Sequence, residues 1–216
     1  SEDRSLESNS EKFEFDIEHY LNPITSVYLG LGFGTTDYEA GTEKDKDTRS
    51  TILGLKYDLD PITKAEAKFS YDFDDYDDGT NDDAYKLDCT LRHKLSNFTD
   101  ISGTYTFGLT GTVSSDYRRY HTNKLALSLS HQFTQKLSLS LGTTYALDNY
   151  LKEDFIGTGL AVDKERKKYD FDLGLNHHLY KWLNLSFSFK HARTISEFAD
   201  ESYRDNIYTW AARLDF

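Results

Sequence analysis

The chain has 216 residues, of which 37 are acidic and 25 basic, so its formal net charge is −12 at pH 7. This charge argues against a nucleic-acid-binding protein, which carries a basic patch, and the 15% aromatic content argues against a disordered chain. The single cysteine, Cys89, excludes a disulfide framework and cysteine-based zinc or haem motifs. No apolar run approaches the roughly 18 residues that a transmembrane helix requires.

Apolar and polar residues alternate strictly along the chain, as in 13–18, 125–130 and 183–189. Because a helix would place residues i and i+2 on nearly opposite faces, this period predicts β-strands. Each expected strand has about ten residues, which is long for a globular protein but suits a tilted crossing of a bilayer. The alternation predicts about eleven strands, at 12–21, 26–36, 49–59, 64–74, 84–95, 100–110, 123–133, 137–148, 168–179, 183–194 and 206–216.

The connections between these segments alternate in length. Tight turns are expected at 21–25, 60–63, 96–99, 134–136 and 180–182, and longer polar loops near 37–48, 75–83, 111–122, 149–167 and 195–205. Short turns on one rim and long loops on the other are typical of membrane barrels. The sequence therefore predicts an all-β, transmembrane, antiparallel up-and-down β-barrel, with residues 1–216 forming one domain and residues 1–11 a polar segment on the side of the long loops.

Each expected strand has one apolar and one polar face, and the polar face carries many charges. These charges cannot form a dry core, because an unpaired buried charge costs several kcal/mol. With lipid against the apolar face and a wet lumen against the charges, a closed sheet also satisfies its own backbone. The charged residues expected to line the lumen are Glu14, Asp16, Glu18, Lys56, Asp58, Glu66, Lys68, Lys86, Asp88, Arg92, Lys94, Asp170, Asp172, Lys190 and Arg213.

Two opposed stripes of charge stand out in this set. Glu14, Asp16 and Glu18 form an acidic stripe on one strand, whereas Lys86, Arg92 and Lys94 form a basic stripe on another. Across a water-filled lumen, such stripes would create a transverse field that screens solutes by charge. The alternative is that the charges pair across adjacent strands and merely hydrate a narrow barrel.

Aromatic residues gather at the expected strand ends, where an interfacial aromatic belt is predicted. His19, His93, His131 and His177 share one outward position in successive hairpins and are expected to replace tyrosine there rather than to converge on a metal. The expected belt consists of Tyr20, Tyr28, Tyr85, Tyr169, Trp182, Tyr208 and Trp210.

The last nine residues of the chain resemble a known C-terminal motif. Tyr208, Trp210, Ala212, Leu214 and Phe216 alternate up to the end of the chain, which resembles the C-terminal signature of Gram-negative outer-membrane β-barrels. The hairpin at 182–187 and the segment 203–206 are similar to those of porin-type barrels. The resemblance implies that Tyr208, Trp210, Leu214 and Phe216 signal to the barrel-assembly machinery. It also implies an outer-membrane location, with a periplasmic C-terminus and extracellular long loops.

The number of expected strands is odd, which bears on the size of the complete barrel. Single-chain bacterial barrels have even strand numbers, whereas about eleven strands are readable here. We expect the chain to be the C-terminal part of a barrel of twelve or more strands. The alternatives are an odd-stranded barrel or a miscounted strand in the loop at 149–167.

Other groups of residues have compositions found in metal, catalytic or lipid-binding sites. Oxygen-rich loops can bind Ca²⁺, and Asp74, Asp75, Asp77 and Asp78 are the metal candidates, but the EF-hand spacing fails and a solvated loop is favoured. Ser130 and His131 are adjacent, yet consecutive strand residues face opposite ways, so neither an enzyme nor a cofactor is expected. Two loop segments remain. Asp116, Arg118, Arg119 and His121 in the loop at 111–122 could bind a phosphorylated lipid headgroup, although a plain surface loop is favoured there. The apolar stretch 155–162 in the loop at 149–167 could fold into the barrel mouth or contact a partner.

The predicted function is a porin-like channel for the passive passage of small hydrophilic solutes, or for the export of a polymer. The alternative is a non-conducting barrel whose acidic extracellular loops serve as an adhesin, a scaffold or an anchor for a partner complex. Expected partners are outer-membrane lipid and lipopolysaccharide, the barrel-assembly machinery, and a homo-oligomer or partner complex, but no nucleic acid.

Overall fold

The computed structural model describes residues 8–38, 45–77, 79, 81–111, 119–153, 160–197 and 201–214. Among these residues no helix is long and apolar enough to span a membrane. The strands are β1 (Ser8–Asn22), β2 (Thr25–Tyr38), β3 (Lys46–Asp60), β4 (Thr63–Tyr76), β5 (Asn81–Ser96), β6 (Thr99–Gly111), β7 (Arg119–Thr134), β8 (Leu137–Glu153), β9 (Leu160–Tyr180), β10 (Leu183–Ser196) and β11 (Tyr203–Leu214).

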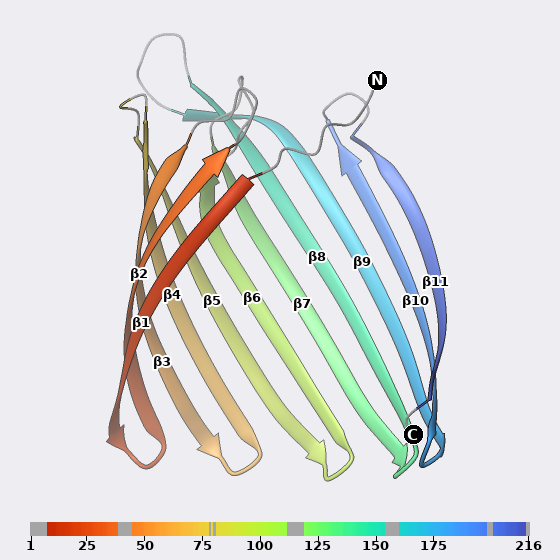
Figure 1. Cartoon of the computed structure of the whole chain (residues 1–216). Helices are drawn as coiled ribbons and strands as arrows, with labels where there is room; N and C mark the ends of the chain where they lie inside the picture. Colours follow the sequence, from red (N-terminus) through yellow and green to blue (C-terminus); the bar gives the residue numbers. More distant parts are fainter. Residues whose placement is uncertain are drawn as a thin grey trace.

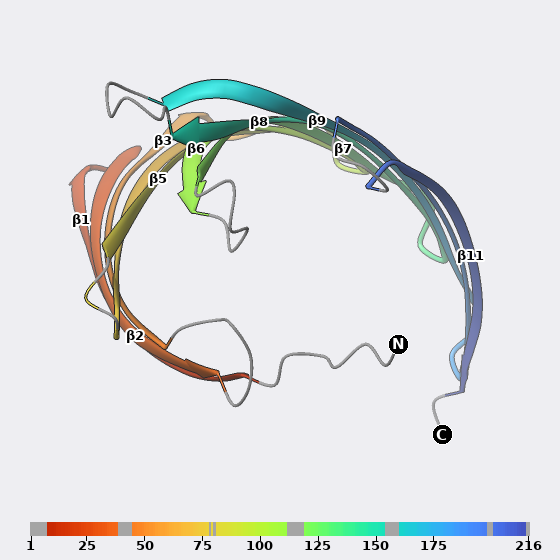
Figure 2. The ribbon, with the colours of Figure 1, turned by 90° about the horizontal axis from the view of Figure 1, so that it is seen from above.

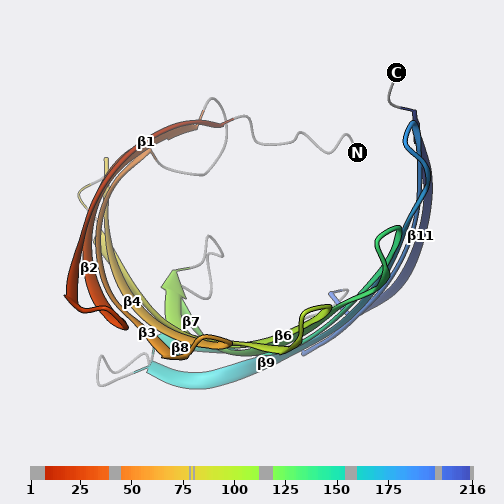
Figure 3. The same ribbon diagram turned by 90° about the horizontal axis from the view of Figure 1, so that it is seen from below.

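These strands form a single sheet in which each strand pairs with its neighbours in the sequence, in the order β1 to β11. Every pairing is antiparallel. The strands are tilted and run side by side (Figure 1), and the sheet curves into an arc with β1 and β11 at its two ends (Figures 2 and 3). The predicted all-β, up-and-down architecture is confirmed, although the sheet does not close within the described residues.

The strands extend beyond the predicted segments. The largest difference lies at β8 and β9, which continue to Glu153 and begin at Leu160. Most of the expected 149–167 loop is therefore strand. The polar residues there obscured the alternation, but Asn149 pairs with Glu165 and Tyr150 with Lys164 in the continuing ladder.

The short turns repeat one local structure at one end of the sheet (Figure 1). The first polar side chain of the turn accepts a hydrogen bond from the backbone N–H two residues later, as Asn22 does from Ile24 at 3.0 Å and Asp60 from Ile62 at 2.8 Å. Ser96 and Thr134 play the same part in the next two turns. The N–H of Ile62 lowers the pKa of the Asp60 carboxyl by this bond.

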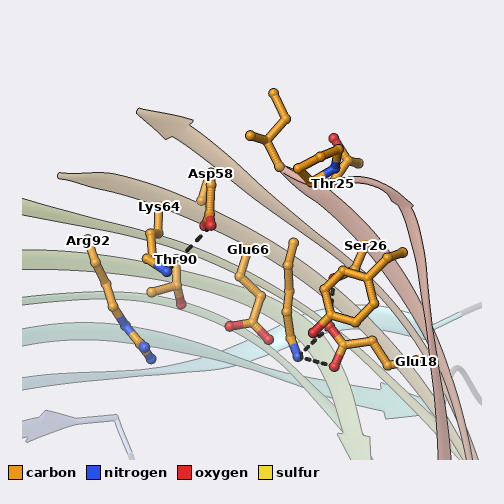
Figure 4. A pocket seen from close by; sticks show the side chains of 13 residues that line it. Glu18, Thr25, Ser26, Asp58, Lys64, Glu66, Thr90 and Arg92 are labelled. Atoms are coloured by element: carbon orange, nitrogen blue, oxygen red, sulfur yellow. Dashed lines mark hydrogen bonds and ion pairs between the residues drawn. The ribbon is translucent and has the colours of Figure 1, made fainter. Parts of the chain in front are cut away.

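The two faces of the sheet have the inverse of a soluble protein's exposure. Leu53 is 53% exposed, Leu127 46% and Trp210 77%, whereas Ser26 on the opposite face is only 4% exposed. The charged and small polar side chains project from the concave side of the arc, as Figure 4 shows for β1 to β5. No large side chain among the described residues is fully buried. A water-soluble protein could not expose so much contiguous apolar surface, so the convex face is built to meet lipid.

Adjacent positions on β7 test this inversion. Leu127 lies on the convex face and Ser128 on the concave face. We expect Leu127→Arg to destabilise the protein folded in lipid vesicles by about 2–4 kcal/mol, because it places a cation against hydrocarbon. Ser128→Arg should change stability by less than about 1 kcal/mol, since its side chain enters water. Urea titration in vesicles measures both values, and equal losses would contradict the assignment of the faces.

Candidate functional site: the charged concave face

Every charged residue expected on the lumen side lies on the concave face, because strand register places those positions opposite the apolar series. The register runs, for example, from Glu14 through Gly32 of β2 to Ser50 of β3. The acidic stripe is on β1, the basic stripe is on β5, and Asp170, Asp172, Lys190 and Arg213 occupy β9 to β11.

Side chains on this face reach across an intervening strand. Glu18 on β1 binds Lys56 on β3, with 3.0 Å between Oε2 and Nζ, and accepts a 2.6 Å hydrogen bond from Ser26 on β2. Neighbouring strands are about 4.8 Å apart, so the bridge from β1 to β3 requires a small residue between them. Curvature toward the concave side also brings the side-chain tips together.

Tyr28 makes a second bridge of this kind. Its hydroxyl donates to Glu66 Oε1 at 3.1 Å, linking β2 to β4 across β3. The ring lies over Gly54, where an added Cβ would overlap it, and Lys56 Nζ lies 5.0 Å from the ring centroid. The prediction that Tyr28 and Tyr20 belong to an interfacial belt is wrong, because both occupy even positions on strands whose convex residues are odd-numbered.

Glycines on β2 have the same spatial role. A Cβ on Gly30 would overlap the Asp16 carboxylate, and one on Gly32 would lie 3.1 Å from Ser50 Cβ. The acidic stripe of β1 therefore leans across β2 toward β3. Ser26, Tyr28 and Gly54 were not predicted from the sequence to be parts of this site. The alternate glycines at 30, 32 and 34 were an available signal, because small residues at concave positions leave room for long neighbours.

A pocket of about 280 Å³ lies at the short-turn end of this face (Figure 4). Glu18 and Lys56 line one side and Lys64, Thr90 and Arg92 the other. Lys64 and Arg92 are direct cross-strand partners on β4 and β5. Lys64 Nζ lies 3.5 Å from Asp58, whereas Arg92 makes no ion pair within the described part of the chain. In this pocket Glu18 is paired with Lys56 and Asp58 with Lys64, while Arg92 on one wall and Glu66 between the walls have no ion pair within the described residues.

A second charged cluster lies on the concave side near the long-loop end. Asp148 on β8 is 2% exposed and lies 3.0 Å from Lys168 and 3.2 Å from Arg166, both on β9. Thr122 donates to it at 2.8 Å, and the Arg166 guanidinium stacks over Tyr150 at 5.0 Å. This cluster was missed because residues 149–167 were interpreted as a loop.

The metal candidates do not converge. Asp74 binds Lys46 at 2.7 Å and accepts from Thr48 at 2.6 Å, and Asp75 follows it on the opposite face of β4. Among the described residues no group of three or more His, Cys, Asp or Glu side chains is placed to hold a metal. Asp78 lies outside the described residues, as do residues 112–118 and 154–159 of the two loop candidates.

The expected histidines lie on the convex face near the short-turn ends of their strands, whereas Tyr208 and Trp210 of the expected aromatic belt lie on the same face in the interior of β11. His93 contacts Thr63 at 2.8 Å and His131 contacts Thr99 at 2.7 Å, one hairpin apart. Tyr208 and Trp210 pack against Phe189 and Phe187 with tilted rings, whose centroids are 4.9 and 4.4 Å apart. Leu214 pairs with Leu183 on the same face, and Phe216 lies outside the described residues.

Solved structures with a similar fold include outer-membrane proteins. The outer-membrane channel DcaP of Acinetobacter baumannii matches with a TM-score of 0.69 at 11% identity, over 94% of this chain and 62% of that one. The FrpB iron transporter of Neisseria meningitidis matches with 0.71 at 8% identity, over 97% and 40%. The ferripyoverdine receptor of Pseudomonas aeruginosa matches with 0.66 at 12% identity, over 96% and 39%. This chain thus spans less than two thirds of each protein, and no curated protein sequence matches it.

The fold and the charged concave face define a porin-like outer-membrane β-barrel architecture. A family profile described as "Putative MetA-pathway of phenol degradation" matches residues 15–163, which is well over half of the chain. The chain belongs to this family.

Gly54 tests the packing of the concave face. We expect Gly54→Ala to destabilise the protein by about 1–3 kcal/mol, because the new methyl group displaces Tyr28 and breaks its bond to Glu66. Gly142→Ala is the matched control, since its Cβ would meet Asp172 Cβ at an ordinary 3.6 Å. Urea unfolding in vesicles compares the two, and equal stability would contradict a packing role for Gly54.

Asp148 tests the second cluster. Asp148→Asn leaves Arg166 and Lys168 without their shared carboxylate, so we expect a loss of up to about 3 kcal/mol. Asp172→Asn is the control, because Asp172 is exposed and makes no ion pair in the described residues. The same unfolding assay measures both variants, and a loss at Asp172 as large as that at Asp148 would contradict the role of burial.

Proposed function

We propose that this chain forms the wall of an outer-membrane channel through which small hydrophilic solutes pass passively. The observation that carries the proposal is the inverted sheet: apolar side chains are exposed on the convex face, while charges and small polar residues occupy the concave face. A closed barrel with this inversion encloses water and is surrounded by lipid. The short turns then lie on the periplasmic side with the C-terminus, and the long loops lie outside the cell.

The charges on the concave face favour a channel that selects solutes by charge over a non-conducting scaffold. On one side, the pairing of Glu18 with Lys56 nearly neutralises the wall. On the other side, Arg92 and the neighbouring Lys94 make no ion pair within the described residues. A field between such unequal walls acts on every charged solute that passes. Catalysis is not part of the proposal, because Ser130 and His131 face opposite sides of β7.

The family description suggests a first solute. It names phenol degradation, and phenol is a small polar aromatic molecule that a hydrated lumen of this kind could pass. Planar-bilayer recording tests conduction, and vesicle swelling then compares phenol with a sugar of known size. We expect stable open steps in the bilayer. Silence at high protein load would overturn the channel and support a non-conducting barrel that presents acidic loops to a partner.

Reversing the charges of Lys64 and Arg92 on the pocket wall should change ion selectivity. We expect Lys64→Glu/Arg92→Glu to raise the cation-to-anion permeability ratio about eightfold, because the free energies of a cation and an anion shift by equal amounts in opposite directions. The four charge units changed alter the free energy of an ion about 10 Å away by roughly 0.6 kcal/mol after screening. Reversal potentials in a salt gradient measure the ratio. Arg49→Gln, on the convex face opposite Phe33 and Phe73, is the control, and an equal change there would contradict the role assigned to the pocket wall.

A further inference from the structure

Two arginines lie directly opposite each other on the convex face. Arg193 of β10 and Arg204 of β11 are cross-strand partners, both exposed, and both continue the outward series that holds Phe189 and Tyr208. Like charges directly opposite each other on antiparallel strands repel and destabilise the pair. The arrangement therefore calls for a counter-charge.

The described part of the chain does not supply that counter-charge. Neither arginine makes an ion pair there, and the nearby acidic residues are engaged elsewhere. Glu165 binds Lys167 at 3.2 Å, and Glu197 accepts from the backbone N–H of Glu165 at 2.8 Å. The other neighbours on this face are Tyr169, which pairs with Arg193, and His191 and Asn206, which bind each other at 2.7 Å.

Another arginine near the same rim has its charge compensated by acidic side chains of this chain. Arg119 at the start of β7 lies 2.5 Å from Asp82 and 2.8 Å from Asp83. It reaches these carboxylates across Gly111 of β6, which pairs with it. Among the described residues Arg119 is thus neutralised internally, whereas Arg193 and Arg204 have no acidic partner.

Their height on the sheet indicates which anion lies beside them. Arg193 follows Leu183, the first residue of β10, by ten positions. Ten residues at about 3.3 Å each, tilted by about 40°, rise roughly 25 Å, which equals the height of the apolar band of outer-membrane barrels. The two guanidinium groups are thus level with lipid headgroups at the long-loop rim, just above the aromatic rings of Phe189 and Tyr208.

We propose that Arg193 and Arg204 together bind a phosphate of lipid A, the phosphorylated anchor of lipopolysaccharide, in the outer leaflet. Each guanidinium group can donate two parallel hydrogen bonds to the oxygens of a phosphate group. The bound anion also relieves the electrostatic repulsion between the two arginines. The exposed aromatic side chains below them contact the acyl chains. This inference rests on the proposed function, because that function places the long-loop rim outside the cell.

The test compares lipid retention by matched variants of the full chain. Wild type, Arg193→Gln/Arg204→Gln and Arg119→Gln are folded in detergent and incubated with bis-phosphorylated lipid A, with lipid A lacking both phosphates, or with phosphatidylglycerol. Native mass spectrometry counts the lipids retained. We expect wild type and Arg119→Gln to retain phosphorylated lipid A at least tenfold more than the double variant, and all three proteins to retain the dephosphorylated lipid equally.

Three outcomes overturn the assignment: equal retention by the double variant and wild type, an equal loss in Arg119→Gln, or retention of phosphatidylglycerol as strong as that of lipid A. A heat-modifiable shift on gel electrophoresis is recorded for every sample to report the folded barrel. A wild-type protein that shows this shift but does not discriminate between the lipids contradicts only the lipid site. A wild-type protein that inserts into vesicles without conducting contradicts the proposed channel and leaves the lipid site standing.

Discussion

The whole molecule depends on one constraint: a polar backbone that crosses lipid must satisfy its hydrogen bonds within its own sheet. The antiparallel ladder meets this requirement from β1 to β11, and it leaves the side chains free to divide by face. Apolar residues then go to the convex side, where Leu53 and Trp210 are widely exposed, and polar residues go to the concave side. Stability in such a sheet comes from lipid around it and from the ladder, because no large side chain among the described residues is fully buried.

The concave face is organised by size as well as by charge. Long side chains bridge strands that are not direct neighbours wherever the strand between them carries a small residue. Ser26 lies under the bridge from Glu18 to Lys56, and Gly54 lies under the bridge from Tyr28 to Glu66. The first bridge pairs opposite charges, whereas the second holds the Glu66 carboxylate by a neutral hydroxyl group. On β5, Lys86 is paired with Asp88, and Arg92 and Lys94 make no ion pair within the described residues.

On the convex face, too, some charged residues have partners of opposite charge and others do not. Arg119 has two aspartates beside it, whereas Arg193 and Arg204 face each other without an acidic partner among the described residues. In our two proposals the membrane supplies an anion at that height, and the two faces meet different surroundings: water and solutes on the concave side, acyl chains and phosphates on the convex side. The solved structures share the antiparallel architecture of this sheet.

The sequence by itself determined the strands, their faces and their order of connection, because a side-chain period of two and turn residues at regular spacing are local properties of a chain. It misplaced Tyr20 and Tyr28, since proximity to a strand end does not say which face a residue occupies. It also ended β8 too early and began β9 too late, where polar residues hide the period. Only the tertiary structure decided that Asp148 is buried between Thr122 and the cations of β9, that Tyr28 crosses Gly54, and that Arg193 meets Arg204. Each of these contacts depends on the register and curvature of strands whose partners are distant in sequence, and a local pattern carries no such information.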